Sequence, residues 1–418
     1  MNLLLKSAKI YAPATAALHH KTRDILIANG TITKIAAKIA LPKNTTEIKL
    51  DNLCVSVGWF DSSVSFGEPG YEERETIANG LEVAGKSGFT DVLLNANTKP
   101  LPNTGSDIVF LKESSRSSST TLHPLGALTL DGKGDALAEL FNMHTMGAVA
   151  FYDYKRAINN SNLLKIALLY AQNFDGLVCS FPEDVAIKGR GIVNEGEIST
   201  KLGLKGIPSL SEELQIARDL YILEYTGGKL HIPTISTAAS VKLIANAKKK
   251  GLNVTTSVAI HNLVLCDEEL ESFDTNFKVK PPLRTKRDTI FLAKGVQNGT
   301  IDFVTSDHRP MTIEEKRVEF DNAGFGTIGL ESAFGALNNL YGVDGAITYL
   351  TKGRERFGMD TPKIEEGQKA CLTLFDPEVK YVFEGKDIHS KSKNAIFLGK
   401  ELKGKVYGSI NNGKSIFK

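Results

Sequence analysis

The sequence predicts an α/β fold in which a (β/α)8 barrel of the TIM type is joined to a small β domain built from both ends of the chain. Three observations predict it. Apolar runs of strand length alternate with helical segments through the middle of the chain, short strands fill both ends, and 418 residues suit a large barrel with an appendage. A doubly wound sheet would give the same alternation, so periodicity alone leaves that alternative open.

Both ends of the chain have the pattern of β structure. Within the first 55 residues, two apolar runs meet at Asn29-Gly30, a dipeptide typical of tight hairpins. The last 54 residues are also short apolar runs, separated by Gly, Asn and Pro. We therefore expect one β domain formed by residues 1–55 and 365–418, and a barrel domain over residues 56–364.

The middle of the chain supplies eight candidate strands with helical segments between most of them. The clearest helix begins near Ser209, where Glu212 completes the spacing of a capping box, and should stop at Gly227. In a barrel, the functional residues lie at the C-terminal ends of the strands. The candidate strands are residues 55–60, 91–95, 121–129, 148–152, 176–180, 229–234, 253–258 and 301–305.

Composition excludes several classes of protein. A net charge of +2 gives no electrostatic basis for binding nucleic acid or a membrane surface. No apolar run reaches the ~18 residues that a membrane span requires. The four cysteines are scattered without a C-x-x-C pair, so neither a zinc knuckle nor a redox motif is indicated. We expect a cytoplasmic protein.

The region from Gly58 to Pro100 carries a specific resemblance. Its sequence, "GWFDSSVSFGEPGYEERETIANGLEVAGKSGFTDVLLNANTKP", resembles the opening of a dihydroorotase of the amidohydrolase superfamily. The frame of that family is Asp-x-His-x-His, then Leu-Arg-Glu-Pro-Gly, then Pro-Asn-Thr. Later segments continue the match in order, among them "GTIDFVTSDHRPMTIEEK" and "SKSKNAIFLGKELKGKV". The resemblance covers nearly the whole chain and implies a barrel with a β domain.

The same resemblance implies a pair of zinc ions held by four histidines and two carboxylates. The matching positions here are Ser63, Ser65, Asp153, Phe181, Thr234 and Asp307. All four imidazoles are therefore replaced, and only the carboxylates remain. Hydroxyl groups are weak zinc donors and a phenyl ring is none. We expect no metal and no other cofactor.

The positions that would hold the substrate are altered as well. The family's arginine, which would grip a substrate carboxylate, corresponds to Gly67, and a second histidine corresponds to Met311. Asn97 and His308 match substrate-binding positions and are expected to be vestigial. Asp307 matches the catalytic base of the family and is expected to be idle.

We therefore expect a dihydroorotase homologue without turnover that has a structural or regulatory role. The resemblance implies aspartate carbamoyltransferase as its partner, and we expect the chain to form a homo-oligomer. Two alternatives stay open. One is an amidohydrolase with altered chemistry that opens a cyclic amide, using Asp307 as base and at most one metal. The other is a working dihydroorotase whose site residues lie elsewhere than the matches above.

Overall fold

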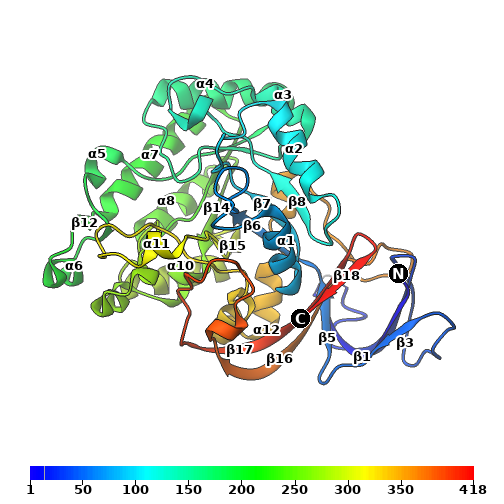
Figure 1. Cartoon of the computed structure of the whole chain (residues 1–418). Helices are drawn as coiled ribbons and strands as arrows, with labels where there is room; N and C mark the ends of the chain where they lie inside the picture. Colours follow the sequence, from blue (N-terminus) through cyan, green and yellow to red (C-terminus); the bar gives the residue numbers. More distant parts are fainter. Residues whose placement is uncertain (14) are drawn as a thin grey trace.

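The computed structural model describes residues 1–13 and 15–418, and it confirms the expected fold class (Figure 1). Eight parallel strands form the barrel, and bridges from Gly126 to Phe151 and from Val64 to His308 join the two halves of its wall. Closure of the wall excludes the doubly wound sheet. The barrel strands are β6 (Trp59–Val64), β7 (Phe89–Leu94), β8 (Thr121–Pro124), β9 (Phe151–Tyr152), β10 (Leu177–Cys179), β13 (Lys229–Ile232), β14 (Val254–Ala259) and β15 (Phe303–Thr305).

One principal helix follows each barrel strand. In chain order these helices are α1 (Ile77–Lys86), α2 (Gly105–Ser115), α3 (Leu140–Met146), α4 (Ser161–Ala171), α7 (Ser209–Thr226), α8 (Ala238–Lys249), α10 (Lys286–Gln297) and α12 (Ala333–Thr351). Shorter elements sit in the loops: α5 (Val185–Lys188), β11 (Val193–Asn194), α6 (Glu197–Leu202), β12 (Gly206–Ile207), α9 (Ile260–Val264) and α11 (Ile313–Lys316). None of the helices in the described part of the chain has the length and apolar character that crossing a membrane requires.

The two ends of α7 differ in how well the sequence predicted them. Gly227 ends the helix in left-handed backbone at φ 70°, as expected, and its N–H donates to the Leu223 carbonyl. The capping box predicted for the start of α7 is wrong. Ser209 is already the first helical residue, and the buried Glu212 carboxylate accepts hydrogen bonds from the N–H groups of Ser236 and Thr237. Glu212 therefore fixes the loop after β13 and not its own helix end.

Strands from both ends of the chain form one eight-stranded sheet, seen in blue and in orange to red in Figure 1. Its order is β18-β17-β16-β5-β1-β2-β3, with β4 beside β1. Asn29 and Gly30 both have positive φ and join β2 to β3, which confirms the hairpin. The strands are β1 (Leu3–Tyr11), β2 (Thr22–Ala28), β3 (Thr31–Ala36), β4 (Thr46–Ile48), β5 (Cys54–Val57), β16 (Leu372–Val382), β17 (Glu401–Asn411) and β18 (Lys414–Phe417).

The expected strand at residues 55–60 is two strands in the structure. Residues up to Val57 pair within the β sheet, and the barrel strand begins at Trp59. Gly58 lies between the two strands. A Cβ at this position would lie 2.2 Å from the Thr90 Oγ1 atom, which is too close for any side chain. The chain therefore passes from sheet to barrel through one residue that must be glycine at this spacing.

Trp59 packs the barrel against the β sheet. The side chain is fully buried, with ring centroids 4.9 Å from Phe334 on α12 and 5.8 Å from Phe375 on β16. Its indole N–H donates to the Ser56 Oγ atom at 3.0 Å, so the polar edge of the ring is satisfied. This aromatic cluster holds the two parts of the fold together.

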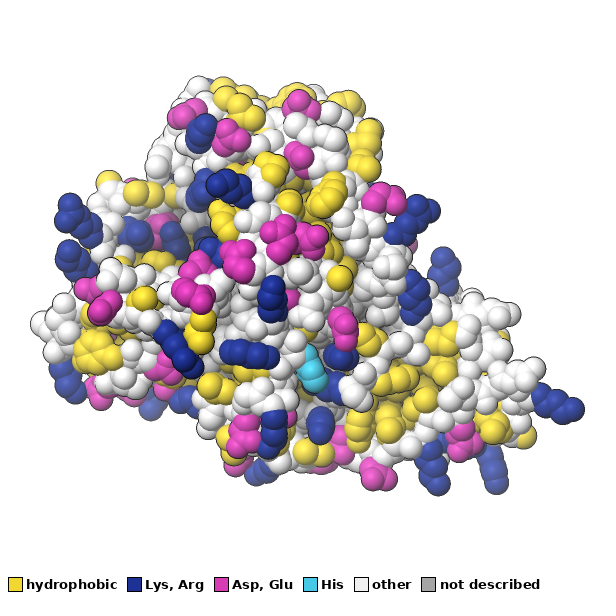
Figure 2. All heavy atoms as spheres, in the orientation of Figure 1, with side chains coloured by type: hydrophobic (Ala, Val, Ile, Leu, Met, Phe, Trp, Pro, Cys, Tyr) yellow, Lys and Arg dark blue, Asp and Glu magenta, His cyan; other side chains and the backbone are white. Residues whose placement is uncertain are grey.

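The face shown in Figure 2 carries Lys and Arg side chains interspersed with Asp and Glu. This mixture agrees with the net charge of +2. Apolar side chains appear between them over several elements.

Removing the Trp59 ring should destabilise the whole chain. We expect Trp59→Ala to lower the free energy of unfolding by about 3–5 kcal/mol, because it leaves a cavity between barrel and sheet. Far-UV circular dichroism in denaturant measures this, since the variant lacks the only tryptophan for fluorescence. Tyr225→Ala is the control: that ring is 81% exposed, so the change should stay within about 0.5 kcal/mol. Equal losses in the two variants would contradict a bridging role for Trp59.

Candidate functional site at the barrel mouth

Asp61 lies on β6 and ties the first barrel strand to the last. Its carboxylate accepts hydrogen bonds from the N–H groups of Ser63, at 3.0 Å, and of Ser306, at 2.8 Å. The Thr305 hydroxyl, at the end of β15, donates to the same group. Burial raises the pKa of Asp61, and these donors favour its ionised form. The carboxylate thus closes the barrel at the end where function resides.

Ser63 and Ser65 are buried at the end of β6 and share one amide partner. The Asn95 Nδ2 atom donates to the Ser63 Oγ atom at 3.1 Å and to the Ser65 Oγ atom at 3.2 Å. Ser63 Oγ in turn donates to the Asp307 Oδ1 atom at 3.3 Å. The cavity beside Ser63 has a volume of about 10 Å³, no more than one water molecule requires.

Asp307 forms a buried ion pair with Lys155. The Lys155 Nζ atom lies 2.5 Å from the Asp307 Oδ2 atom, and the two side chains are 5% and 2% exposed. Burial lowers the pKa of Lys155 to about 8, while Asp307 opposes that shift. Burial likewise raises the pKa of Asp307, opposed by Lys155. Each charge is therefore the chief compensation for burying the other.

A second lysine lies against Phe181. The Lys280 Nζ atom is 5.0 Å from the centre of the Phe181 ring and 2.6 Å from the Glu183 carboxylate. Burial lowers the pKa of Lys280, and the nearby charge of Lys280 contributes to the lowered pKa of Lys155. The mouth therefore holds two ion pairs, Lys155 with Asp307 and Lys280 with Glu183, in a largely dry environment.

Thr234 and Asp153 have different surroundings from the serines. Thr234 has left-handed backbone at φ 51°, its N–H donates to the Ser257 Oγ atom, and its own hydroxyl is buried without a hydrogen-bond partner. The Asp153 Oδ1 atom accepts from the N–H groups of Leu128 and Thr129 at 2.9 and 3.0 Å. Asp153 thus holds the loop after β8.

The family's arginine position is closed by the chain itself. A Cβ on Gly67 would lie 1.6 Å from the Tyr71 carbonyl oxygen and 2.9 Å from that of Glu75. Gly67 already bonds to both residues through its backbone, at 2.8 Å each. A side chain at position 67 is therefore incompatible with this loop, which means that no arginine could enter without moving it.

The other substrate positions are buried or bound internally. His308 is fully buried, its Nδ1 atom accepts from the Gly329 N–H, and burial lowers its pKa to about 3. The Asn97 Oδ1 atom is buried without a partner. Met311 is buried, and its N–H donates to the Asn394 side chain. Met311 also lines a cavity of about 660 Å³, together with Lys316 and Asn394.

The loops around the mouth are fastened to one another. Arg74 forms a bidentate ion pair with Glu315 on α11. The Glu75 carboxylate accepts from the Lys391 N–H at 3.0 Å, which ties in the segment between β16 and β17. The Lys316 ammonium donates to the carbonyl oxygens of Thr275, at 2.7 Å, and Gly324, at 2.9 Å. These contacts hold the loops in the closed arrangement.

Comparison with known proteins assigns the family. The chain is 37% identical to a dihydroorotase of Pelotomaculum thermopropionicum, an alignment covering 100% of this chain and 98% of the relative. The chain belongs to the dihydroorotase family. It is also 34% identical to a dihydroorotase of Geobacter metallireducens, with complete coverage of both. A dihydro-orotase-like family model matches residues 54–240.

Solved structures of other proteins share the fold. The L-hydantoinase of Arthrobacter aurescens superposes with a TM-score of 0.85 at 20% identity, covering 100% of this chain and 96% of that one. A dihydropyrimidinase from Brevibacillus agri gives a TM-score of 0.81, also at 20% identity, covering 100% of this chain and 95% of the other. These likenesses establish the barrel and its β domain.

The residues of this dihydroorotase homologue do not fit the dinuclear zinc centre that the resemblance implies. Zinc requires imidazole, thiolate or carboxylate donors. Ser63 is hydrogen-bonded to Asn95 and Asp307, Phe181 offers no donor atom, and Asp153 accepts hydrogen bonds from the loop after β8. The other carboxylate at these positions, Asp307, is already paired with the Lys155 ammonium.

Sequence reasoning missed the residue that defines the site. Lys155 lies two positions after Asp153 at the end of β9, which is a place where a barrel presents functional side chains. A lysine at the end of a barrel strand could have been noticed as a candidate site residue. Its partner Asp307 is 152 positions away in the chain, so no local pattern indicated the pair. Asn95 was visible as a polar residue ending its strand, although its bonds to both serines were not.

The ion pair predicts a specific pattern of stability. Lys155→Met leaves the Asp307 carboxylate buried without its cation, so we expect the free energy of unfolding to fall by about 3–5 kcal/mol at neutral pH. Adding Asp307→Asn should restore much of the loss, since no buried charge then remains. Chemical denaturation of both variants measures the difference.

Lys229→Met is the matched control. Lys229 pairs with Asp175 at the same 2.5 Å, but Asp175 is 82% exposed. Its loss should change stability by at most about 1 kcal/mol. If Lys155→Met has no larger effect than this control, the buried pair does not support the fold.

Proposed function

We propose that this chain is a non-catalytic member of the dihydroorotase family, which acts in the cytoplasm as a structural or regulatory partner of aspartate carbamoyltransferase. The observation that carries the proposal is the ion pair between Lys155 and Asp307. It pairs the carboxylate at the family's last ligand and base position with a lysine ammonium. The family's four histidine ligand positions are Ser63, Ser65, Phe181 and Thr234 here.

The chemistry of the family explains why these replacements favour loss of turnover. Opening a cyclic amide needs an activated water and a polarised carbonyl. A bound metal lowers the pKa of water from about 16 to about 7. Without such activation almost no hydroxide is available at neutral pH. The backbone closed over Gly67 also removes the place for a bidentate contact to a substrate carboxylate.

A second candidate is an enzyme with altered chemistry, and one observation favours it. A lysine whose pKa is near 8 beside a buried carboxylate is a pattern found in active sites. Access argues against it. Both side chains are at most 5% exposed, and the neighbouring cavity has room for about one water molecule. Ligand pockets normally have volumes of roughly 300–1,000 Å³.

We expect no turnover of dihydroorotate or carbamoyl aspartate by the purified chain, with or without added zinc. The Pelotomaculum relative, assayed in parallel, is the positive control. Hydantoin and dihydrouracil belong in the panel, because the structural neighbours include a hydantoinase and a dihydropyrimidinase.

Two results would contradict this expectation in different ways. Chelator-sensitive turnover of dihydroorotate at about 1 s⁻¹ or faster would identify a working dihydroorotase. Turnover of another cyclic amide that Asp307→Asn abolishes, and that chelators leave unchanged, would identify the altered enzyme.

A surface stripe on α7 supports a role in assembly. Leu214, Tyr221 and Tyr225 lie at helical spacings of seven and four residues, and are 46%, 73% and 81% exposed. Beside Tyr221 is a groove of about 120 Å³, whose lining includes Leu220 and Leu243. Exposed tyrosines next to apolar grooves are frequent at protein interfaces.

We expect the chain to co-elute with aspartate carbamoyltransferase from the same organism in size-exclusion chromatography with light scattering. Tyr221→Ser combined with Tyr225→Ser should weaken the complex by about tenfold or more if α7 lies in the contact. Tyr170→Ser, an exposed tyrosine on α4, is the matched control. Separate elution of the two proteins at concentrations well above those in a cell would refute the partnership. If this chain associates only with itself, the exposed stripe on α7 would instead be a homo-oligomer contact.

A further inference from the structure

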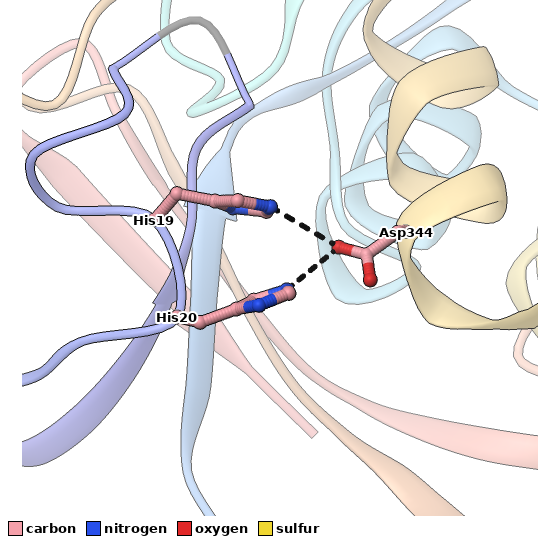
Figure 3. Close-up of side chains that lie close together, drawn as sticks. All are labelled: His19, His20 and Asp344. Carbon is pink, nitrogen blue, oxygen red and sulfur yellow. Dashed lines mark hydrogen bonds and ion pairs between the residues drawn. The ribbon is translucent and has the colours of Figure 1, made fainter.

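Two consecutive histidines and an aspartate from distant parts of the chain meet beside the join between the β domain and the barrel (Figure 3). His19 and His20 lie in the connection between β1 and β2. Asp344 lies on α12, two residues after Gly342, where left-handed backbone at φ 70° breaks the helix. Their contacts therefore link the β domain to the outer ring of the barrel.

The three ligand atoms have separations close to those in a metal site. The Asp344 Oδ1 atom lies 2.9 Å from the His20 Nε2 atom and 3.6 Å from the His19 Nε2 atom. All three side chains offer ligand atoms within 4.8 Å of one another. Tetrahedral zinc with bonds of about 2.0–2.1 Å holds its ligand atoms about 3.3 Å apart. The observed spacing brackets that value, so small side-chain shifts would suffice.

The backbone aims both imidazoles at the same point. His19 and His20 lie at the end of a turn. His20 has left-handed backbone at φ 62°, and the two ring centroids are 3.8 Å apart with planes inclined by 30°. The Tyr11 ring packs edge-on against His20 with centroids 5.1 Å apart. Left-handed backbone is uncommon outside glycine, although histidine is among the residues that adopt it more often, and here both imidazoles lie against Asp344.

The donors and their exposure suit a borderline divalent cation. Two imidazoles and a carboxylate are typical zinc ligands, and three protein ligands leave a position for water. The side chains of His19, His20 and Asp344 are 26%, 47% and 54% exposed, so an ion can reach the site from solvent. The His19 Nδ1 atom is buried without a hydrogen-bond partner, which leaves Nε2 as the ring atom presented to an ion.

We propose that His19, His20 and Asp344 bind one Zn²⁺ ion that fastens the β1–β2 connection to α12. The site is independent of the family's barrel mouth and uses none of its residues. Its consequence is structural: an ion bound only by the folded chain stabilises the arrangement of the two parts.

The test uses the full chain after removal of metals by a chelator. Titration with ZnCl₂ against a chromophoric competitor should give one ion per chain, and zinc should raise the melting temperature. His20→Asn, His19→Ala and Asp344→Asn should each weaken binding by about tenfold or more and remove the thermal shift. Asparagine is chosen at position 20 because it tolerates left-handed backbone. His144→Ala, which removes an exposed histidine on α3, should bind zinc as the unaltered chain does.

Each outcome decides the proposal. Failure of the unaltered chain to bind zinc at tenfold excess would overturn it. Zinc binding that survives all three substitutions places the ion elsewhere and overturns it equally. Binding that Asp307→Asn abolishes, while His20→Asn leaves it intact, would place the ion in the barrel mouth. That result would also count against the proposed loss of catalysis, whereas failure of the His19, His20 and Asp344 site alone would not.

Discussion

The Asp61 carboxylate is the constraint on which the mouth of this barrel depends. The Val64–His308 bridge joins the first and last barrel strands, and Asp61 reinforces that join by accepting donors from β6 and from the end of β15. In this chain the first residue of the family's Asp-x-His-x-His frame therefore supports closure through protein donors. The bridge and Asp61 make this join without the side chains at the two histidine positions that follow, so serine can occupy them without disrupting the join between β6 and β15.

Charge balance explains how the site can remain folded. Asp307 is buried at the end of a barrel strand, and a buried carboxylate without compensation is strongly destabilising. In a metal centre the ions compensate such groups. Here the Lys155 ammonium does so, and Lys280 plays a comparable part toward Glu183 beside Phe181. The lysines supply positive charge but no vacant orbital for a water or a carbonyl oxygen. These lysines can therefore reproduce the electrostatic part of a metal's role but not its Lewis acidity.

The sequence was informative where local pattern or family frame determines structure. Each of the eight expected barrel strands has a counterpart, because apolar strand runs and their intervening helices are local signals. The frame also located Ser63 and Asp307, which the structure joins by a hydrogen bond. The sequence did not predict the hydrogen-bond and ion-pair partners of individual side chains. Glu212 had the spacing of a helix cap, yet its carboxylate serves a loop 24 residues away, and Lys155 finds Asp307 across the barrel. Such pairings depend on tertiary contacts that no local window contains.

Gly67 bears on the evolutionary history of the site. Its backbone is bonded to Tyr71 and Glu75, and the loop that contains them is bonded to Lys391 on the far side of the mouth. A chain that regained histidines at the end of β6 would still lack room for an arginine at position 67. An arginine introduced alone would disrupt this loop without restoring a metal site. Under the non-catalytic role proposed above, a return to activity would need the loop, the arginine and the histidines to change together.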